Sequence, residues 1–194
     1  MAYSVLIAGL LVFLAAHSVR IVADEWRTRT IARIGAQAWK GAFSLLSIAG
    51  FLLIVWGFSL ARSEPVPLWS PPLALRHLAS LLILPAFILL LAAYVPGNAI
   101  RARLHHPMVL AVKTWALAHL LANGNVADAL LFGSFLLWAV FSFSAARRRD
   151  RAAGTCYAPG RMLPTAATVV AGSLAWAVFA FWLHGLLFGV QPLA

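Results

Sequence analysis

The chain of 194 residues contains a single cysteine, Cys156, and this scarcity excludes several kinds of site. One thiol forms no disulfide framework, completes no CxxCH haem-attachment motif and cannot hold an iron–sulfur cluster. Motifs of other enzyme classes are missing as well. The sequence has no HExxH, no glycine-rich phosphate-binding loop and no Ser–His–Asp set.

Acidic side chains are almost as scarce. The five acidic residues are Asp24, Glu25, Glu64, Asp128 and Asp150, and none falls in the middle of an apolar stretch. A proton-relay transporter usually places a carboxylate deep in the membrane. The placement of the acidic residues therefore argues against that class of protein.

Apolar side chains, in contrast, dominate the sequence. Hydrophobic residues make up 63% of the chain and charged residues 10%, whereas a soluble domain carries about 25% charged residues. Apolar stretches close to the spanning length of about 20 residues occur at 3–22, 41–61, 75–95, 107–123, 126–146 and 165–189. We therefore expect an all-α, polytopic integral membrane bundle of six transmembrane helices, with residues 1–194 forming one domain. A further helical segment is expected at 24–38.

Positive charge is distributed unevenly along the chain, whose net charge is +10. Thirteen of the fifteen Lys and Arg residues fall within or next to three predicted loops, at residues 20–40, 101–113 and 147–161. By the positive-inside rule these loops are cytoplasmic and both termini lie on the non-cytoplasmic side. The basic run at 147–149 could also suggest nucleic acid, but a topogenic loop facing lipid headgroups explains it better. Membrane lipid, and not nucleic acid, is therefore the expected partner.

Histidines are the main polar groups inside the predicted spans, and His17 and His119 lie deepest. Each is either a neutral imidazole bonded to a neighbouring helix or a metal ligand, and the sequence leaves both interpretations open. His77 and His184 lie near the outer ends of their spans, where structural or interfacial roles are favoured. His106 precedes Pro107, a pattern typical of the start of a helix.

Helix geometry limits which histidines can share one metal ion. His106 and His119 are separated by about 20 Å along a regular helix and by about 140° in direction, so they cannot bind the same metal. Adjacent side chains such as His105 and His106 diverge by about 100° and chelate poorly. His17 with His119 is the workable pair across two helices, as in haem sites between the helices of a bundle.

Several runs around these histidines resemble a known family. They are His105-His-Pro-Met, Trp115-Ala-Leu-Ala-His-Leu-Leu-Ala-Asn-Gly-Asn, Leu131-Phe-Gly-Ser-Phe, Arg147-Arg-Arg-Asp and the Ala16-His17-Ser18 element. Together they look strongly like the NnrU family of bacterial membrane proteins, which is similar to the plant and cyanobacterial 15-cis-ζ-carotene isomerase. The resemblance covers most of the chain and implies a multi-pass protein of the bacterial inner membrane.

The resemblance also implies a haem b site. In the isomerase, haem b is held by a helix-one histidine and by the histidine of an Ala-His-(x)₃-Gly-Asn-like segment, and these positions match His17 and His119. His106 remains the alternative second ligand. Two departures weaken the transfer of the catalytic step: Ala116 stands where the isomerase has a cysteine, and the run from Trp138 to Phe141 replaces a histidine-rich stretch.

Two functions of different classes follow from the resemblance. The first is haem-dependent cis–trans isomerisation of a membrane-dissolved polyene such as a carotenoid, with His17 as the retained axial ligand and His119 as the ligand released during catalysis. Arg20, Arg101 and Arg103 are candidate partners of the haem propionates, although a topogenic role explains them at least as well. The second is a non-enzymatic accessory or assembly subunit of a respiratory, denitrification-linked or photosynthetic membrane complex.

Overall fold

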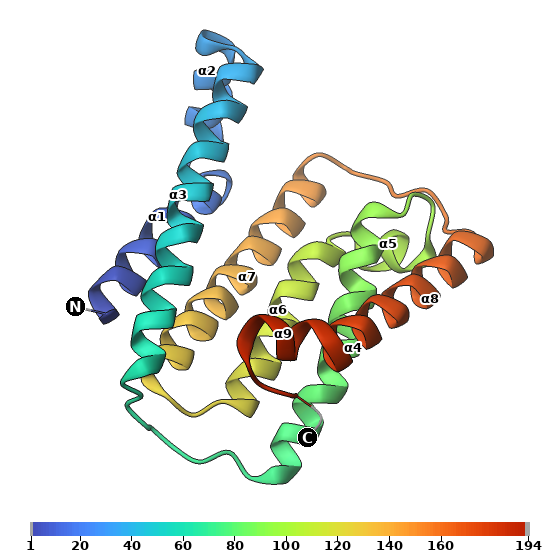
Figure 1. The fold of residues 1–194 in the computed structure, drawn as a ribbon. Coiled ribbons are helices and arrows are strands. Elements are labelled where there is room, and N and C mark those ends of the chain that lie inside the picture. The colour runs from blue at the N-terminus through green and yellow to red at the C-terminus, as the bar shows by residue number, and fades with distance from the viewer. Residues whose placement is uncertain (1, 193–194) are drawn as a thin grey trace. The chain divides into compact units, whose positions relative to one another are not determined.

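The computed structural model describes residues 2–192, and this part of the chain is helical, with two isolated β-bridges and no strand. It divides into two compact units. The first comprises the residues up to Trp69 together with Gly124–Ser142, and the second comprises Ser70–Asn123 and the residues after Ser142. Figure 1 shows the order of the helices along the chain. The all-α prediction is therefore confirmed.

The helices of the first unit are α1 (Ala2–Val22), α2 (Asp24–Ile34), α3 (Ala36–Ser63) and the beginning of α7 (Val126–Ala152). Those of the second unit are α4 (Leu73–Tyr94), α5 (Ala99–Leu104), α6 (Pro107–Ala122), the end of α7, α8 (Met162–Val178), the π-helical turn η1 (Phe179–Leu183) and α9 (His184–Phe188). The expected helix at 24–38 is thus present as α2, which ends at Ile34.

Five of the predicted spans are helices long and apolar enough to cross a membrane, namely α1, α3, α4, α7 and the continuous segment Met162–Phe188. The sixth, predicted at 107–123, corresponds to α6, which has 16 residues. At 1.5 Å per residue α6 is about 24 Å long, less than the bilayer hydrocarbon thickness of about 30 Å. Five candidate spans are therefore established, and the sixth remains a prediction.

Helix ends occur where proline and asparagine predict them. Leu73 begins α4 directly after Pro72, and Pro107 begins α6, where a missing backbone N–H costs least. Asn123 ends α6, and its side-chain amide donates a hydrogen bond to the His119 carbonyl at 2.8 Å. The Asn123 side chain therefore caps the last turn of α6, which carries His119.

In the first unit α1 and α3 pack closely because glycines remove side chains from their interface. A Cβ atom on Gly57 would lie 2.3 Å from the Leu6 nitrogen, and one on Gly9 would lie 2.6 Å from the Ile54 nitrogen. Rising residue numbers on α1 meet falling numbers on α3, so the two helices are antiparallel. Small residues that let backbones approach are the usual basis of helix association in membranes.

In the second unit α4 packs against α6 and α8. The connection after α4 is held by Asn98, a fully buried side chain that donates to the Ala92 carbonyl at 2.9 Å and accepts from the Arg101 amide at 2.8 Å. Thr165 on α8 accepts a hydrogen bond from the Ala99 amide at 2.8 Å. These contacts place α5 at the end of α4 and against the start of α8.

Candidate functional site

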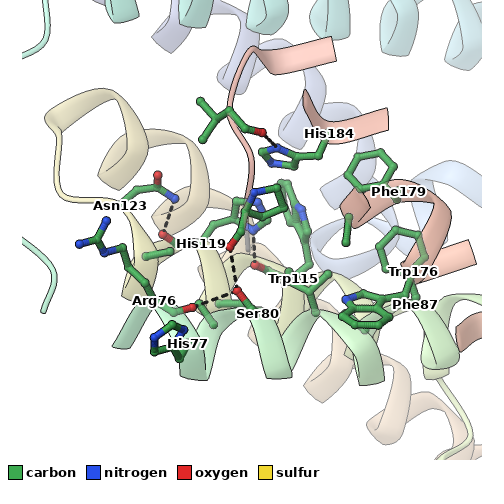
Figure 2. Close-up of a pocket in the computed structure, with 18 of the residues that line it drawn as sticks. Arg76, His77, Ser80, Phe87, Trp115, His119, Asn123, Trp176, Phe179 and His184 are labelled. Atoms are coloured by element: carbon green, nitrogen blue, oxygen red, sulfur yellow. Dashed lines mark hydrogen bonds between the residues drawn. The ribbon is translucent and has the colours of Figure 1, made fainter. Parts of the chain in front are cut away.

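A cavity of about 600 Å³ in the second unit contains His119. Its lining comes from α4, α6, the segment Met162–Phe188 and residues 190–192, and Figure 2 shows the side chains gathered from these elements. The cavity also includes His77 and His184, two histidines expected to have structural or interfacial roles. The structure thus brings three of the six histidines to one cavity.

His119 is oriented by its own helix. Its Nδ1 lies 2.9 Å from the carbonyl oxygen of Trp115, four residues earlier. A carbonyl only accepts, so Nδ1 carries the hydrogen and the lone pair of the neutral ring is on Nε2. A hydrogen bond from Nδ1 to a backbone carbonyl is the arrangement that commonly orients metal-ligating histidines.

Four Phe and Trp side chains form part of the wall of this cavity. Trp115 lies 5.2 Å from the His119 ring, and Phe87 on α4 lies 5.5 Å from Phe179 on η1, measured between centroids. Trp176 of α8 completes the aromatic lining. Such a wall suits a flat, apolar ligand, because π faces contribute both apolar area and a preferred geometry. Ala116 is fully buried and is not among the lining residues described.

Two polar side chains of the cavity bind the C-terminal segment. His184 donates from Nδ1 to the Val190 carbonyl at 2.7 Å, and Ser80 on α4 donates to the Pro192 carbonyl at 3.2 Å. Figure 2 shows Ser80 between Arg76 and this segment. The C-terminal segment is therefore anchored to α4 and α9 beside the cavity.

His17 lies in the first unit and is oriented in the same way as His119. Its Nδ1 donates to the Phe13 carbonyl at 2.7 Å, again four residues earlier on the same helix. The ring stacks on Phe13 at 4.1 Å and lies 5.0 Å from Phe43 of α3. His17 also lines a separate cavity of about 550 Å³ formed by α1, α2 and α3.

Trp138, next to His17, has an indole N–H without an acceptor among the described residues. Its ring lies edge-on to the His17 ring at 6.2 Å, and its indole nitrogen is buried with no hydrogen-bond partner among the described residues. Buried indole N–H groups normally have an acceptor. A ligand bound beside His17 could supply one.

The three predicted propionate partners lie in different surroundings. Arg20 lines the cavity that contains His17. Arg101 and Arg103 are exposed on α5, and neither is among the described lining residues of the His119 cavity. The Arg101 guanidinium donates to the Ala93 carbonyl at 3.3 Å.

A cluster that the sequence analysis missed involves His106 and Asp150. His106 Nε2 donates to Asp150 Oδ2 at 2.8 Å, and the Tyr157 hydroxyl donates to the same oxygen at 2.9 Å. Burial and this hydrogen bond raise the pKa of Tyr157, which keeps the phenol protonated as a donor. Nε2 of His106 is therefore engaged by a carboxylate 44 positions away in sequence.

His105 completes the cluster through its backbone as well as its ring. It stacks on Tyr157 at 4.0 Å with nearly parallel planes and accepts a hydrogen bond from Arg147. Its φ is +67°, and the His106 amide donates to the Leu104 carbonyl across it, which makes a strained γ-turn. The His106–Pro107 pair indicated a helix start, but the sequence contained no information on these partners.

The candidate donors are single histidines and not a cluster of ligands. Within residues 2–192, no three His, Cys, Asp or Glu side chains are grouped to hold a metal ion. A haem needs only one or two axial protein ligands, because the porphyrin supplies the other four. His17 in the first unit and His119 in the second each have Nδ1 bonded to a backbone carbonyl and the Nε2 lone pair suited to that role.

Several long apolar helices, with histidines held at cavities inside each unit, define a multi-pass helical membrane protein. The chain belongs to the NnrU family, because the family model described as "NnrU protein" matches residues 5–192. No curated protein and no solved structure matches the chain. The predicted family is therefore confirmed, while the likeness to the carotene isomerase stays a prediction.

Proposed function

We propose that this NnrU-family protein binds haem b in the bacterial inner membrane and isomerises a cis double bond of a membrane-dissolved polyene. The observation that carries the proposal is the aromatic-walled cavity of about 600 Å³ beside His119. Ligand pockets of about 300–1,000 Å³ lined by apolar side chains with a few polar groups are typical of small-molecule sites. A polyene is apolar and flat, which suits the aromatic part of this lining.

His17 and His119 are the proposed axial ligands. Both have Nδ1 bonded to a carbonyl one turn earlier, which leaves Nε2 as the ligating nitrogen. His106 is less suited as the second ligand, because its Nε2 is already bonded to Asp150. Arg20 shares a cavity with His17, which supports it as a propionate partner, and for Arg101 and Arg103 the topogenic role is sufficient.

Haem held by these residues would supply an iron centre able, when ferrous, to bind an alkene. The chain's own residues provide the rest of the site. Trp115, Trp176 and Phe179 orient an apolar substrate against the face of α6 that carries His119. The C-terminal segment, anchored through His184 and Ser80, limits access of water to the cavity.

We also propose that α6 crosses the membrane, which gives six spans with both termini on the non-cytoplasmic side. Two contacts in the first unit support this topology. The Leu68 amide donates to the Gly124 carbonyl at 2.7 Å, and the Val126 amide donates to the Val66 carbonyl at 2.9 Å. The turn after α6 therefore lies beside the loop between α3 and α4. A short helix that spans the bilayer is accommodated by local thinning at modest cost.

The absorption spectrum of the purified chain, recorded before and after dithionite reduction, tests haem binding. We expect the spectrum of a low-spin bis-histidine haem. The reduced protein should convert a cis-carotenoid substrate and the oxidised protein should not, because ferrous iron binds an alkene far better than ferric iron does. Equal conversion in both states, or none in either with haem fully loaded, would contradict the isomerase proposal and favour the accessory-subunit alternative.

A further inference from the structure

The cavity beside His17 extends past Arg20 to the bend where α1 passes through α2 into α3. Three cationic side chains line this part: Arg20 from α1, Arg27 from α2 and Lys40 from α3. They are brought together because the chain breaks at Ala23 and reverses at Gly35, whose φ of +86° favours glycine. Figure 1 shows α2 at the far end of the α1–α3 pair.

Positive charge at this bend exceeds the negative charge available to balance it. Asp24 is the nearest acid, and its carboxylate lies 3.8 Å from Arg20 Nε and 4.0 Å from Arg27. Glu25 pairs instead with Arg29, away from the cavity, at 3.7 Å. Lys40 has no ion pair with any of the described residues. Three cations therefore line the cavity, and Asp24 pairs with two of them.

The remaining walls of the cavity are apolar and aromatic. Val19 and Ile31 line it together with Trp39, which is half-buried and lies 5.8 Å from Trp26. The Arg27 guanidinium lies over the Trp39 ring at 5.9 Å. Paired tryptophans beside basic residues are typical of the headgroup level of a membrane. Further along α1 and α3, large side chains such as Leu11 and Leu45 are exposed.

We propose that this cavity binds the phosphate headgroup of an anionic phospholipid, with its acyl chains against the exposed apolar faces of α1 and α3. The charge complementarity of Arg20, Arg27 and Lys40 selects an anion, and charge-assisted hydrogen bonds hold the phosphate. The apolar wall and the neighbouring exposed leucines favour a lipid over free phosphate, which has no apolar part. Arg20 is also a proposed partner of a haem propionate, whereas Arg27 and Lys40 are not, so the test changes only Arg27 and Lys40.

The test uses the full chain, purified in neutral detergent, and intact-complex mass spectrometry with added phosphatidylglycerol, phosphatidylcholine or inorganic phosphate. Wild type should retain phosphatidylglycerol in preference to phosphatidylcholine. Each removed cation should weaken that binding about fivefold, so Arg27→Gln/Lys40→Gln should weaken it about 25-fold. Arg29→Gln/Arg33→Gln is the matched control, because it removes two cations of the same segment that do not line the cavity.

Three outcomes would overturn the proposal. An equal loss of phosphatidylglycerol binding in the test and control variants would show that net charge alone attracts the lipid. Displacement of phosphatidylglycerol by inorganic phosphate at equal concentration would assign the site to a free anion. Loss of haem with retention of lipid would make the two cations propionate partners.

Lys40→Gln alone provides a second measurement if the double variant fails to fold. Lys40 is exposed and has no ion pair among the described residues, so the single change should leave the fold intact. Its phosphatidylglycerol affinity should fall about fivefold. An unchanged affinity would contradict the proposal.

Discussion

A histidine that donates from Nδ1 to the carbonyl one helical turn earlier occurs at both His17 and His119. The hydrogen bond sets the tautomer and turns Nε2 away from the helix's own backbone. It also reduces the cost of placing an imidazole in an apolar span, because one ring nitrogen is satisfied locally. The tautomer and orientation of both side chains therefore suit axial ligation.

Replacing either of these histidines tests the ligand assignment. His17→Ala and His119→Ala should each abolish the low-spin bis-histidine spectrum or leave the protein without haem. His77→Ala and His184→Ala serve as controls, and both should leave the spectrum nearly unchanged. A normal low-spin spectrum in His119→Ala would remove that residue from the ligand set, and His106 would be tested next.

At the scale of helices, the α1–α3 pair depends on the absence of side chains. Gly57 and Gly9 meet backbone atoms of the opposite helix, which cannot move without separating the two helices. Gly41 is on the same helix α3 but meets nothing within 4 Å. Comparing alanine substitutions at Gly57 and Gly41 therefore separates the effect of packing from that of helix propensity.

Gly57→Ala should destabilise the protein by about 1–3 kcal/mol, because the new methyl group overpacks the interface against Leu6. Gly41→Ala should stabilise it by up to about 1 kcal/mol through helix propensity. Unfolding of both variants in detergent, followed by circular dichroism, measures the difference. Equal stabilities would mean that the α1–α3 interface relaxes freely around Gly57.

At the scale of the whole molecule, the number of spans decides on which side each loop lies. Six spans place the loop between α7 and α8 on the side opposite the loop between α3 and α4. If α6 does not cross, both loops lie on the same side. Cys156, the single cysteine, is exposed in the first of these loops and provides a natural probe.

A membrane-impermeant maleimide should leave wild-type Cys156 unmodified in intact spheroplasts and should label it after permeabilisation. The matched variant Cys156→Ser/Ser70→Cys moves the thiol to the loop before α4, where Ser70 is exposed. That variant should be labelled in intact spheroplasts. Labelling of both proteins from outside would show that α6 does not cross the membrane.

Composition and local pattern by themselves determined the membrane class, the all-α fold, the helix start at Pro107 and the family. These features depend on residues that are neighbours in sequence, so a one-dimensional pattern contains them. The pairing of His106 with Asp150, the gathering of Trp115, Trp176 and Phe87 around one cavity, and the meeting of Arg27 with Lys40 were decided by tertiary structure. Hydropathy records which side chains avoid water, but which of them meet depends on how the helices pack.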